Sequence, residues 1–155
     1  KYNQEQIQKI LKDFKYKLFK NAVDSKSGEL LKLQKYIQGD TKRDTPSGNM
    51  GTSGFVYENN HHGWQGDYEE VQSINFKDLV GDKNVEILKV DCEGAEYNFL
   101  INVDLSNVNI ILMELHNFLG EEKQAELCKW IEKTHNAVYS SGGGVGHFVK
   151  VWKRK

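Results

Sequence analysis

The sequence is poor in cysteine, in net charge and in long apolar runs, and each shortage excludes a class of protein. Its 155 residues hold only two cysteines, Cys92 and Cys128, which is too few for a disulfide framework and lacks the spacing of a zinc site. We expect both cysteines to be reduced and to pack against apolar side chains. Reduced cysteines favour a reducing compartment, so we expect the protein to be cytoplasmic. The net charge is −1, so no basic field favours nucleic acid as a partner.

The apolar runs are too short for a membrane protein. No stretch approaches the roughly 18 apolar residues that a membrane-spanning helix needs. The N-terminal sequence, KYNQEQIQKILKDFK, is polar and amphipathic and does not have the pattern of a signal peptide. The length suits one domain, residues 1–155, with a sizeable core. The sequence therefore predicts a single domain that binds neither nucleic acid nor membrane.

The first half of the chain mixes short apolar segments with turn-forming and polar ones. Spacings of three and four predict a helix, and short β-branched or aromatic runs predict strands. The predicted segments are a helix over 3–15, a strand over 16–23, a turn over 24–28, a strand over 30–37 as a candidate partner of the first strand, a long polar loop over 39–67, a strand over 69–75 and a helical turn over 75–80. Loops as long as this one are often functional.

The second half alternates strands and helices more regularly. The predicted elements are a strand over 85–91, a helix over 94–102, a strand over 108–115, a helix over 120–134, and strands over 137–141 and 147–152. Alternation of this kind predicts a parallel sheet with right-handed crossovers. The glycine-rich link between the last two strands is too short for a crossover, so they should form an antiparallel hairpin. We therefore expect an α/β domain with one reversed edge strand.

Acidic side chains and one histidine gather where two of these strands end. Asp91 ends one strand, and Glu93 and Glu96 share a face at the start of the next helix. Glu114 and His116 end the following strand and, being two apart, project to the same side. Because ligands bind at the carboxyl ends of parallel strands, we expect these groups to converge on one crevice. With no matching lysines, such a cluster favours a proton, a metal or a hydroxylated ligand.

Simpler interpretations stay open for each of these groups. Glu93 and Glu96 are also what a solvated first helical turn would carry, and His116 is equally consistent with a structural histidine. The pair His61-His62 lies in the polar loop without spaced partners, which is more typical of surface groups than of metal ligands. The glycines of 142–146 precede a strand, so a hairpin turn is favoured over a phosphate loop.

Several motifs in order resemble one family. The stretch ILKVDCEGAEYNFL, with its D-x-E-G-x-E pattern, and the later MELH resemble the signature of FkbM-type methyltransferases. Upstream, KNAVD resembles the strand that ends in Asn-Ala in that family. NMGTS resembles the family's N-x-G-x-S loop, and SINFKDLV resembles the segment before its signature strand. The resemblance implies a Rossmann-like class I methyltransferase sheet of seven strands, mostly parallel, that binds S-adenosylmethionine and methylates a hydroxyl oxygen.

The resemblance also implies roles for particular residues. These are Asp91, His116 and Glu114 in catalysis, Glu93 and Glu96 in binding the acceptor substrate, and Asn21, Ala22 and Asp91 in binding the cofactor, with no metal assigned. In this family a strand with a glycine loop and a strand ending in an acidic residue hold the cofactor. No such strands precede the first predicted helix, so we expect the domain to be incomplete at its N-terminal side.

Three classes of function therefore remain as hypotheses. The first is an S-adenosylmethionine-dependent O-methyltransferase acting on a saccharide or a similar hydroxylated metabolite. The second is a catalytically inactive, methyltransferase-like binding or assembly module. The third is a metal-dependent transferase or hydrolase that uses the acidic cluster. A sheet that lacks central strands would also expose an edge, which favours a homo-oligomer as a further possibility.

Overall fold

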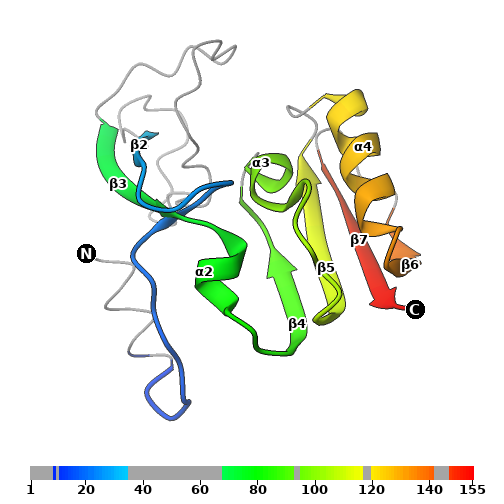
Figure 1. The fold of residues 1–155 in the computed structure, drawn as a ribbon, viewed down its shortest axis with the longest axis horizontal. Coiled ribbons are helices and arrows are strands. Elements are labelled where there is room, and N and C mark those ends of the chain that lie inside the picture. Colours follow the sequence, from blue (N-terminus) through cyan, green and yellow to red (C-terminus); the bar gives the residue numbers. More distant parts are fainter. Residues whose placement is uncertain (1–8, 10, 35–67, 93–94, 117–119, 142–146) are drawn as a thin grey trace, which may run out of the picture.

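The structure, a computed structural model, describes residues 9, 11–34, 68–92, 95–116, 120–141 and 147–155. The long loop predicted over 39–67, with the pair His61-His62, lies outside these residues, as do Glu93 and residues 3–8 and 10 of the helix predicted over 3–15. Residues 11–15 form a turn, in which the Phe14 backbone N–H donates to the Leu11 carbonyl at 2.9 Å, so the predicted helix is wrong there. The described residues form two sheets and three helices, with the larger sheet built from the second half of the chain (Figure 1).

The larger sheet has four strands, in the order β4-β5-β7-β6. They are β4 (Val85–Val90), β5 (Val108–His116), β6 (His135–Ser140) and β7 (His147–Arg154). β4 pairs in parallel with β5, whereas β7 pairs antiparallel with both β5 and β6. The predicted parallel pair and the predicted antiparallel hairpin are both confirmed, and the sheet is mixed.

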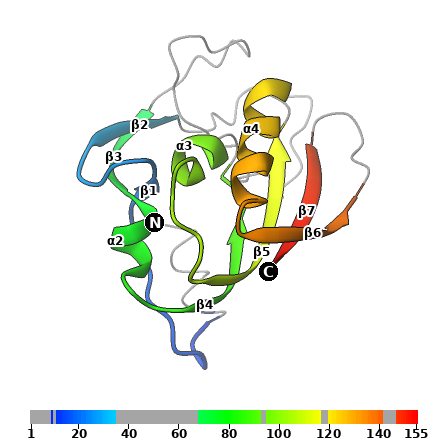
Figure 2. The same ribbon diagram turned by 45° about the vertical axis from the view of Figure 1, so that its right-hand side comes forward.

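The position of the reversed strand differs from the prediction. We expected it at the edge, but β7 lies between β5 and β6, and β6 is the edge strand (Figure 2). The side chains explain the order. Trp152 of β7 is fully buried, at 0% exposure, and pairs with Ile111 on β5 and Ala137 on β6. Val138 and Tyr139 of β6 remain 59% and 57% exposed, as suits an edge.

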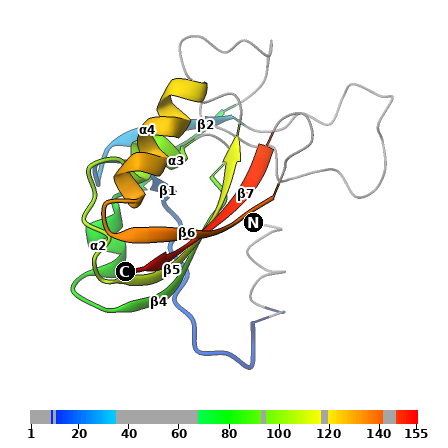
Figure 3. The same ribbon diagram turned by 90° about the vertical axis from the view of Figure 1, so that its right-hand side faces the viewer.

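One face of the larger sheet is covered by helices. α3 (Glu96–Leu100) and α4 (Glu121–Ile131) lie on the same side of it (Figure 3). Along β5, Ile111, Met113 and Leu115 are fully buried while the residues between them are only partly buried, which is the period of two expected for a strand. The core that results contains Phe76, Val90, Phe99, Leu100, Leu105, Val108, Ile111, Met113, Leu115, Leu127, Cys128, Ile131 and Trp152.

The smaller sheet has three strands, in the order β1-β3-β2. They are β1 (Ala22–Val23), β2 (Leu30–Gln34) and β3 (Tyr68–Ile74). The strand predicted over 16–23 is wrong for residues 16–21, because only two of its residues find a partner strand. β2 pairs antiparallel with β3 and not with the first strand, so that suggested pairing is also wrong.

The turn between β1 and β2 is held by a buried serine. Ser73 of β3 donates its hydroxyl to the Lys26 carbonyl at 2.7 Å and accepts the Glu29 backbone N–H at 3.0 Å. Gly28 has a φ of 81°, a conformation that glycine adopts without steric cost. The predicted turn over 24–28 is confirmed, and one side chain satisfies the backbone groups that it would otherwise leave unpaired.

A short helix links the two sheets. α2 (Phe76–Val80) begins after Asn75, whose side chain accepts the Asp78 backbone N–H at 2.8 Å as an N-cap. Phe76 contacts Phe99 of α3 edge to face, with ring centroids 5.9 Å apart, so α2 joins the core of the larger sheet. None of the helices in the described part of the chain is long and apolar enough to cross a membrane.

Candidate active site

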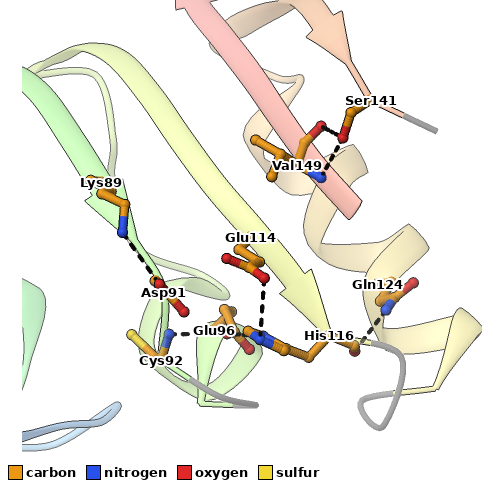
Figure 4. A network of polar contacts seen from close by, with 9 residues as sticks. All are labelled: Lys89, Asp91, Cys92, Glu96, Glu114, His116, Gln124, Ser141 and Val149. Carbon is orange, nitrogen blue, oxygen red and sulfur yellow. Dashed lines mark hydrogen bonds and ion pairs between the residues drawn. The ribbon is translucent and has the colours of Figure 1, made fainter. Parts of the chain in front are cut away.

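A buried glutamate and a buried histidine meet at the carboxyl ends of two parallel strands. Glu96 is the first residue of α3, which follows β4, and His116 is the last residue of β5. Glu96 Oε1 lies 2.9 Å from His116 Nδ1, and the two side chains are 0% and 7% exposed (Figure 4). Because Glu96 is buried and paired, the interpretation of this residue as a solvated first-turn group is wrong.

The backbone of the turn after β4 fixes this carboxylate. Just before α3 begins, the Ala95 backbone N–H donates to the Cys92 carbonyl at 3.2 Å. The Cys92 backbone N–H donates to Glu96 Oε1 at 3.1 Å. A buried carboxylate is tolerated only where donors of this kind compensate its lost hydration. Glu96 therefore ties together the end of β4, the start of α3 and the end of β5.

Glu114 lies on the other side of the imidazole. Its Oε1 is 3.9 Å from His116 Nε2, and its side chain is 29% exposed. This contact confirms that the two residues project to the same side of β5. At 3.9 Å the contact is electrostatic rather than a hydrogen bond. The two ring nitrogens of His116 thus each face a carboxylate, one buried and one that reaches solvent.

Asp91 follows β4 but has a different partner. Its Oδ2 lies 3.2 Å from Lys89 Nζ, and the two side chains are 35% and 64% exposed. The expectation of an acidic cluster without matching lysines is therefore wrong at Asp91. An exposed pair of this kind contributes at most about 1 kcal/mol to stability, and the Asp91 carboxylate remains partly exposed to solvent beside Lys89.

The remaining predicted site residues are not joined to the Glu96–His116 pair by the contacts described. Asn21 is exposed just before β1, and Ala22 is half-buried within β1, which belongs to the smaller sheet. Glu93 lies outside the described residues. In the part of the chain that the structure describes, no group of three or more His, Cys, Asp or Glu side chains is arranged to hold a metal ion.

Sequence reasoning missed Gln124. This residue of α4 is 8% exposed, and its Nε2 donates to the His116 carbonyl at 2.7 Å. It shares the buried face of α4 with Leu127, Cys128 and Ile131 at helical spacing. An amide at a position where the pattern calls for an apolar residue was the signal that could have revealed it.

Cys92 lies beside the site and is a poor nucleophile. Burial raises the pKa of its thiol to about 12, and the charges of Glu96 and Asp91 act in the same direction. The thiolate is the reactive form of cysteine, so this thiol stays inert near neutral pH. Both cysteines are free, and Cys128 packs in the core, which confirms their expected packing role.

The raised pKa of Cys92 gives a pH dependence of stability that can be measured. Above about pH 8.5 the unfolded chain ionises this thiol while the folded chain holds it protonated up to about 12, so stability falls as pH rises through this window. Between pH 8 and pH 10 the loss from this one group should be at most about 2 kcal/mol. The contribution of Cys92 is isolated by measuring the free energy of unfolding in urea for the wild type and for Cys92→Ser at both pH values. If the free energy of unfolding falls equally in the two proteins, Cys92 is not the source of the pH dependence.

The fold and the site first indicate a broad class of protein, and the sequence comparison then indicates a family. A mixed α/β sheet with carboxylates and an imidazole at the carboxyl ends of its parallel strands is an α/β protein with polar groups at the edge where such folds commonly bind ligands. Within that class, the sequence model of the methyltransferase FkbM domain matches residues 5–141. The chain belongs to the FkbM methyltransferase family, which confirms the resemblance. No curated protein and no solved structure matches the chain in the corresponding comparisons.

Proposed function

We propose that the protein is an S-adenosylmethionine-dependent O-methyltransferase that acts on a hydroxyl group of a saccharide or a similar metabolite, through one Rossmann-like domain over 1–155. The observation that carries the proposal is the Glu96–His116 pair, an imidazole in contact with a buried carboxylate, at the carboxyl ends of parallel strands in a chain of this family. The free, protonated cysteines are compatible with a reducing cytoplasm.

The described residues fit the polar parts of the cofactor. S-adenosylmethionine carries a cationic sulfonium and ammonium group and ribose hydroxyls. Asp91 offers an accessible carboxylate after β4, and Asn21 offers an exposed amide before β1. Opposite charge favours the first contact and hydrogen bonding the second. Asp91, Asn21 and the neighbouring backbone of Ala22 are therefore the residues proposed to contact the cofactor.

The chain's own residues then have two tasks. The cofactor supplies an electrophilic methyl group, so the protein must align the acceptor oxygen and remove its proton. Alignment alone is worth on the order of 7–11 kcal/mol in well-oriented reactions. His116 would accept the hydroxyl proton at Nε2, and a base in this role adds about 10²–10⁴-fold in rate. Glu114 would stabilise the imidazolium that forms, from the 3.9 Å at which it lies.

A binding and turnover experiment tests the proposal. We expect S-adenosylmethionine to bind the enzyme by calorimetric titration, and S-adenosylhomocysteine to form when a panel of mono- and oligosaccharides is added. Asp91→Asn should weaken cofactor binding about tenfold, since it removes the charge and keeps the shape. The matched control is Asp104→Asn, an exposed aspartate whose side chain accepts the nearby Ser106 backbone N–H. This variant should bind the cofactor like the wild type.

The outcomes separate the three hypotheses from the sequence. Cofactor binding without turnover on any acceptor would favour an inactive methyltransferase-like module. No cofactor binding at all would contradict the proposed function. Turnover that depends on an added divalent cation and not on the cofactor would favour the metal-dependent hypothesis instead.

A further inference from the structure

Glu96 is poorly placed to touch a substrate. Its side chain is fully buried, and its Oε1 already accepts the Cys92 backbone N–H at 3.1 Å and contacts His116 Nδ1 at 2.9 Å. A carboxylate in that position acts on the groups that surround it rather than on a ligand at the edge of the sheet. Of these two groups that contact Oε1, the imidazole is the one that can accept or donate a proton in a reaction.

The hydrogen bonds determine which ring nitrogen carries the proton. Oε1 of Glu96 serves as an acceptor for the Cys92 backbone N–H, so the contact with His116 is satisfied when Nδ1 is the donor. The neutral imidazole then carries its lone pair on Nε2. That nitrogen faces Glu114, the more exposed of the two carboxylates that flank the ring.

The backbone of His116 is held independently of its ring. Gln124 donates to the His116 carbonyl from α4 at 2.7 Å, so β5 cannot shift its last residue without breaking a buried hydrogen bond. Among the described residues, His116 contacts Glu96 from α3, Glu114 from β5 itself, and the uncharged Gln124 from α4. On β7 its register partner is His147.

From this arrangement we infer that Glu96 is a positioning residue, which holds His116 as the Nδ1–H tautomer and directs the lone pair of Nε2 toward the strand edge. The inference gives Glu96 a role different from the acceptor binding that the family resemblance implied. It rests on the proposed function only where turnover is measured, because the tautomer of His116 exists with or without a substrate.

The tautomer is tested without any activity. Long-range ¹H–¹⁵N spectra of the histidine rings, with His116 assigned by the loss of its signals in His116→Gln, should show a protonated Nδ1 and an unprotonated Nε2 at pH 8. In Glu96→Gln the titration midpoint of His116 should move to lower pH by about one unit or more, since the adjacent negative charge is gone. A wild-type ring protonated on Nε2 would overturn the inference.

Turnover tests whether positioning matters to the reaction. We expect Glu96→Gln to lower kcat by about 10–100-fold with KM for the acceptor within about twofold, and to shift the acid limb of the pH–rate profile downward. The double variant Glu96→Gln/His116→Gln should be no slower than His116→Gln alone, because Glu96 acts through the imidazole. If the two losses multiply instead, the inference fails.

A matched control keeps the result separate from folding. Glu126→Gln removes another glutamate, which accepts the Tyr97 hydroxyl at 2.6 Å between α3 and α4 and is exposed. Its kcat and its His116 midpoint should match the wild type. An equal shift in this control would overturn the inference. If the wild-type protein shows no methyltransferase activity, the proposed function is wrong. The tautomer measurement would still decide the role of Glu96.

Discussion

Replacing His116 with glutamine should lower kcat by about 10²–10⁴-fold and abolish the acid limb of the pH–rate profile. The reason is that His116 is the proposed base, and glutamine keeps a polar side chain of similar reach without a group that titrates near neutral pH. Binding of S-adenosylmethionine should change less than about threefold, because the imidazole is proposed to act on the acceptor. Initial rates of S-adenosylhomocysteine formation from pH 5 to 9 provide the measurement.

The chain supplies a second buried histidine as the control. His135 is 1% exposed, and its ring contacts the Thr134 hydroxyl at 2.8 Å and the Val108 carbonyl at 3.0 Å, at the start of β6. His135→Gln should lower stability while the shape of the pH–rate profile stays that of the wild type. If His116→Gln leaves the rate and the profile unchanged, His116 is not the base.

Replacing Trp152 with alanine should destabilise the fold by about 3–5 kcal/mol. Its indole is fully buried in β7, packs in the same core as Leu127 and Ile131 of α4, and lies between the two neighbouring strands of the sheet. Removing it leaves a cavity that surrounding side chains can fill only in part. For a chain of this length the loss corresponds to a fall in Tm of roughly 10–20 °C.

An exposed aromatic residue on the adjacent strand is the control for Trp152. Tyr139 of β6 is 57% exposed, so Tyr139→Ala should change stability by less than about 1 kcal/mol. Chemical denaturation followed by circular dichroism measures both variants. Similar losses in the two would mean that the indole does not carry the core, and that β7 is held mainly by its backbone pairing.

The larger sheet was predictable because its signals are local. Apolar runs of strand length, separated by amphipathic segments of helix length, predicted β4, β5, α3 and α4 to within a few residues. Strand order was not predictable in the same way. Whether β6 or β7 lies beside β5 depends on which strand can bury more of its side chains, and that choice is made by long-range packing around Trp152.

The smaller sheet shows the opposite case. The segment before Ala22 has the composition of a strand, but a strand forms only where a neighbour accepts its backbone hydrogen bonds. β3 supplies pairing for only two residues of β1 and gives its other edge to β2. The sequence of one segment carries no information about the length of its partner, so both the extent of β1 and the partner of β2 were mispredicted.

In the candidate site, the period of two in a strand was enough to place Glu114 and His116 on one side of β5. The burial of Glu96 could not be derived, because the position at the first turn of a helix suits a solvated acid equally well. What decides between the two is the imidazole of His116, twenty residues away in sequence. Gln124 was missed for a related reason, since its partner is a backbone carbonyl of another element.

The place of β7 in the sheet has a consequence for the order in which the protein is assembled. β6 is made before β7, yet among the strands that the structure describes β7 is the one with which it pairs. During synthesis β6 must therefore wait until β7 has emerged to pair with it, and the hairpin that they form joins the sheet only when β7 docks on β5. The first half of the sheet can form early from β4 and β5, whereas closure of the second half is a late event that depends on contacts distant in sequence.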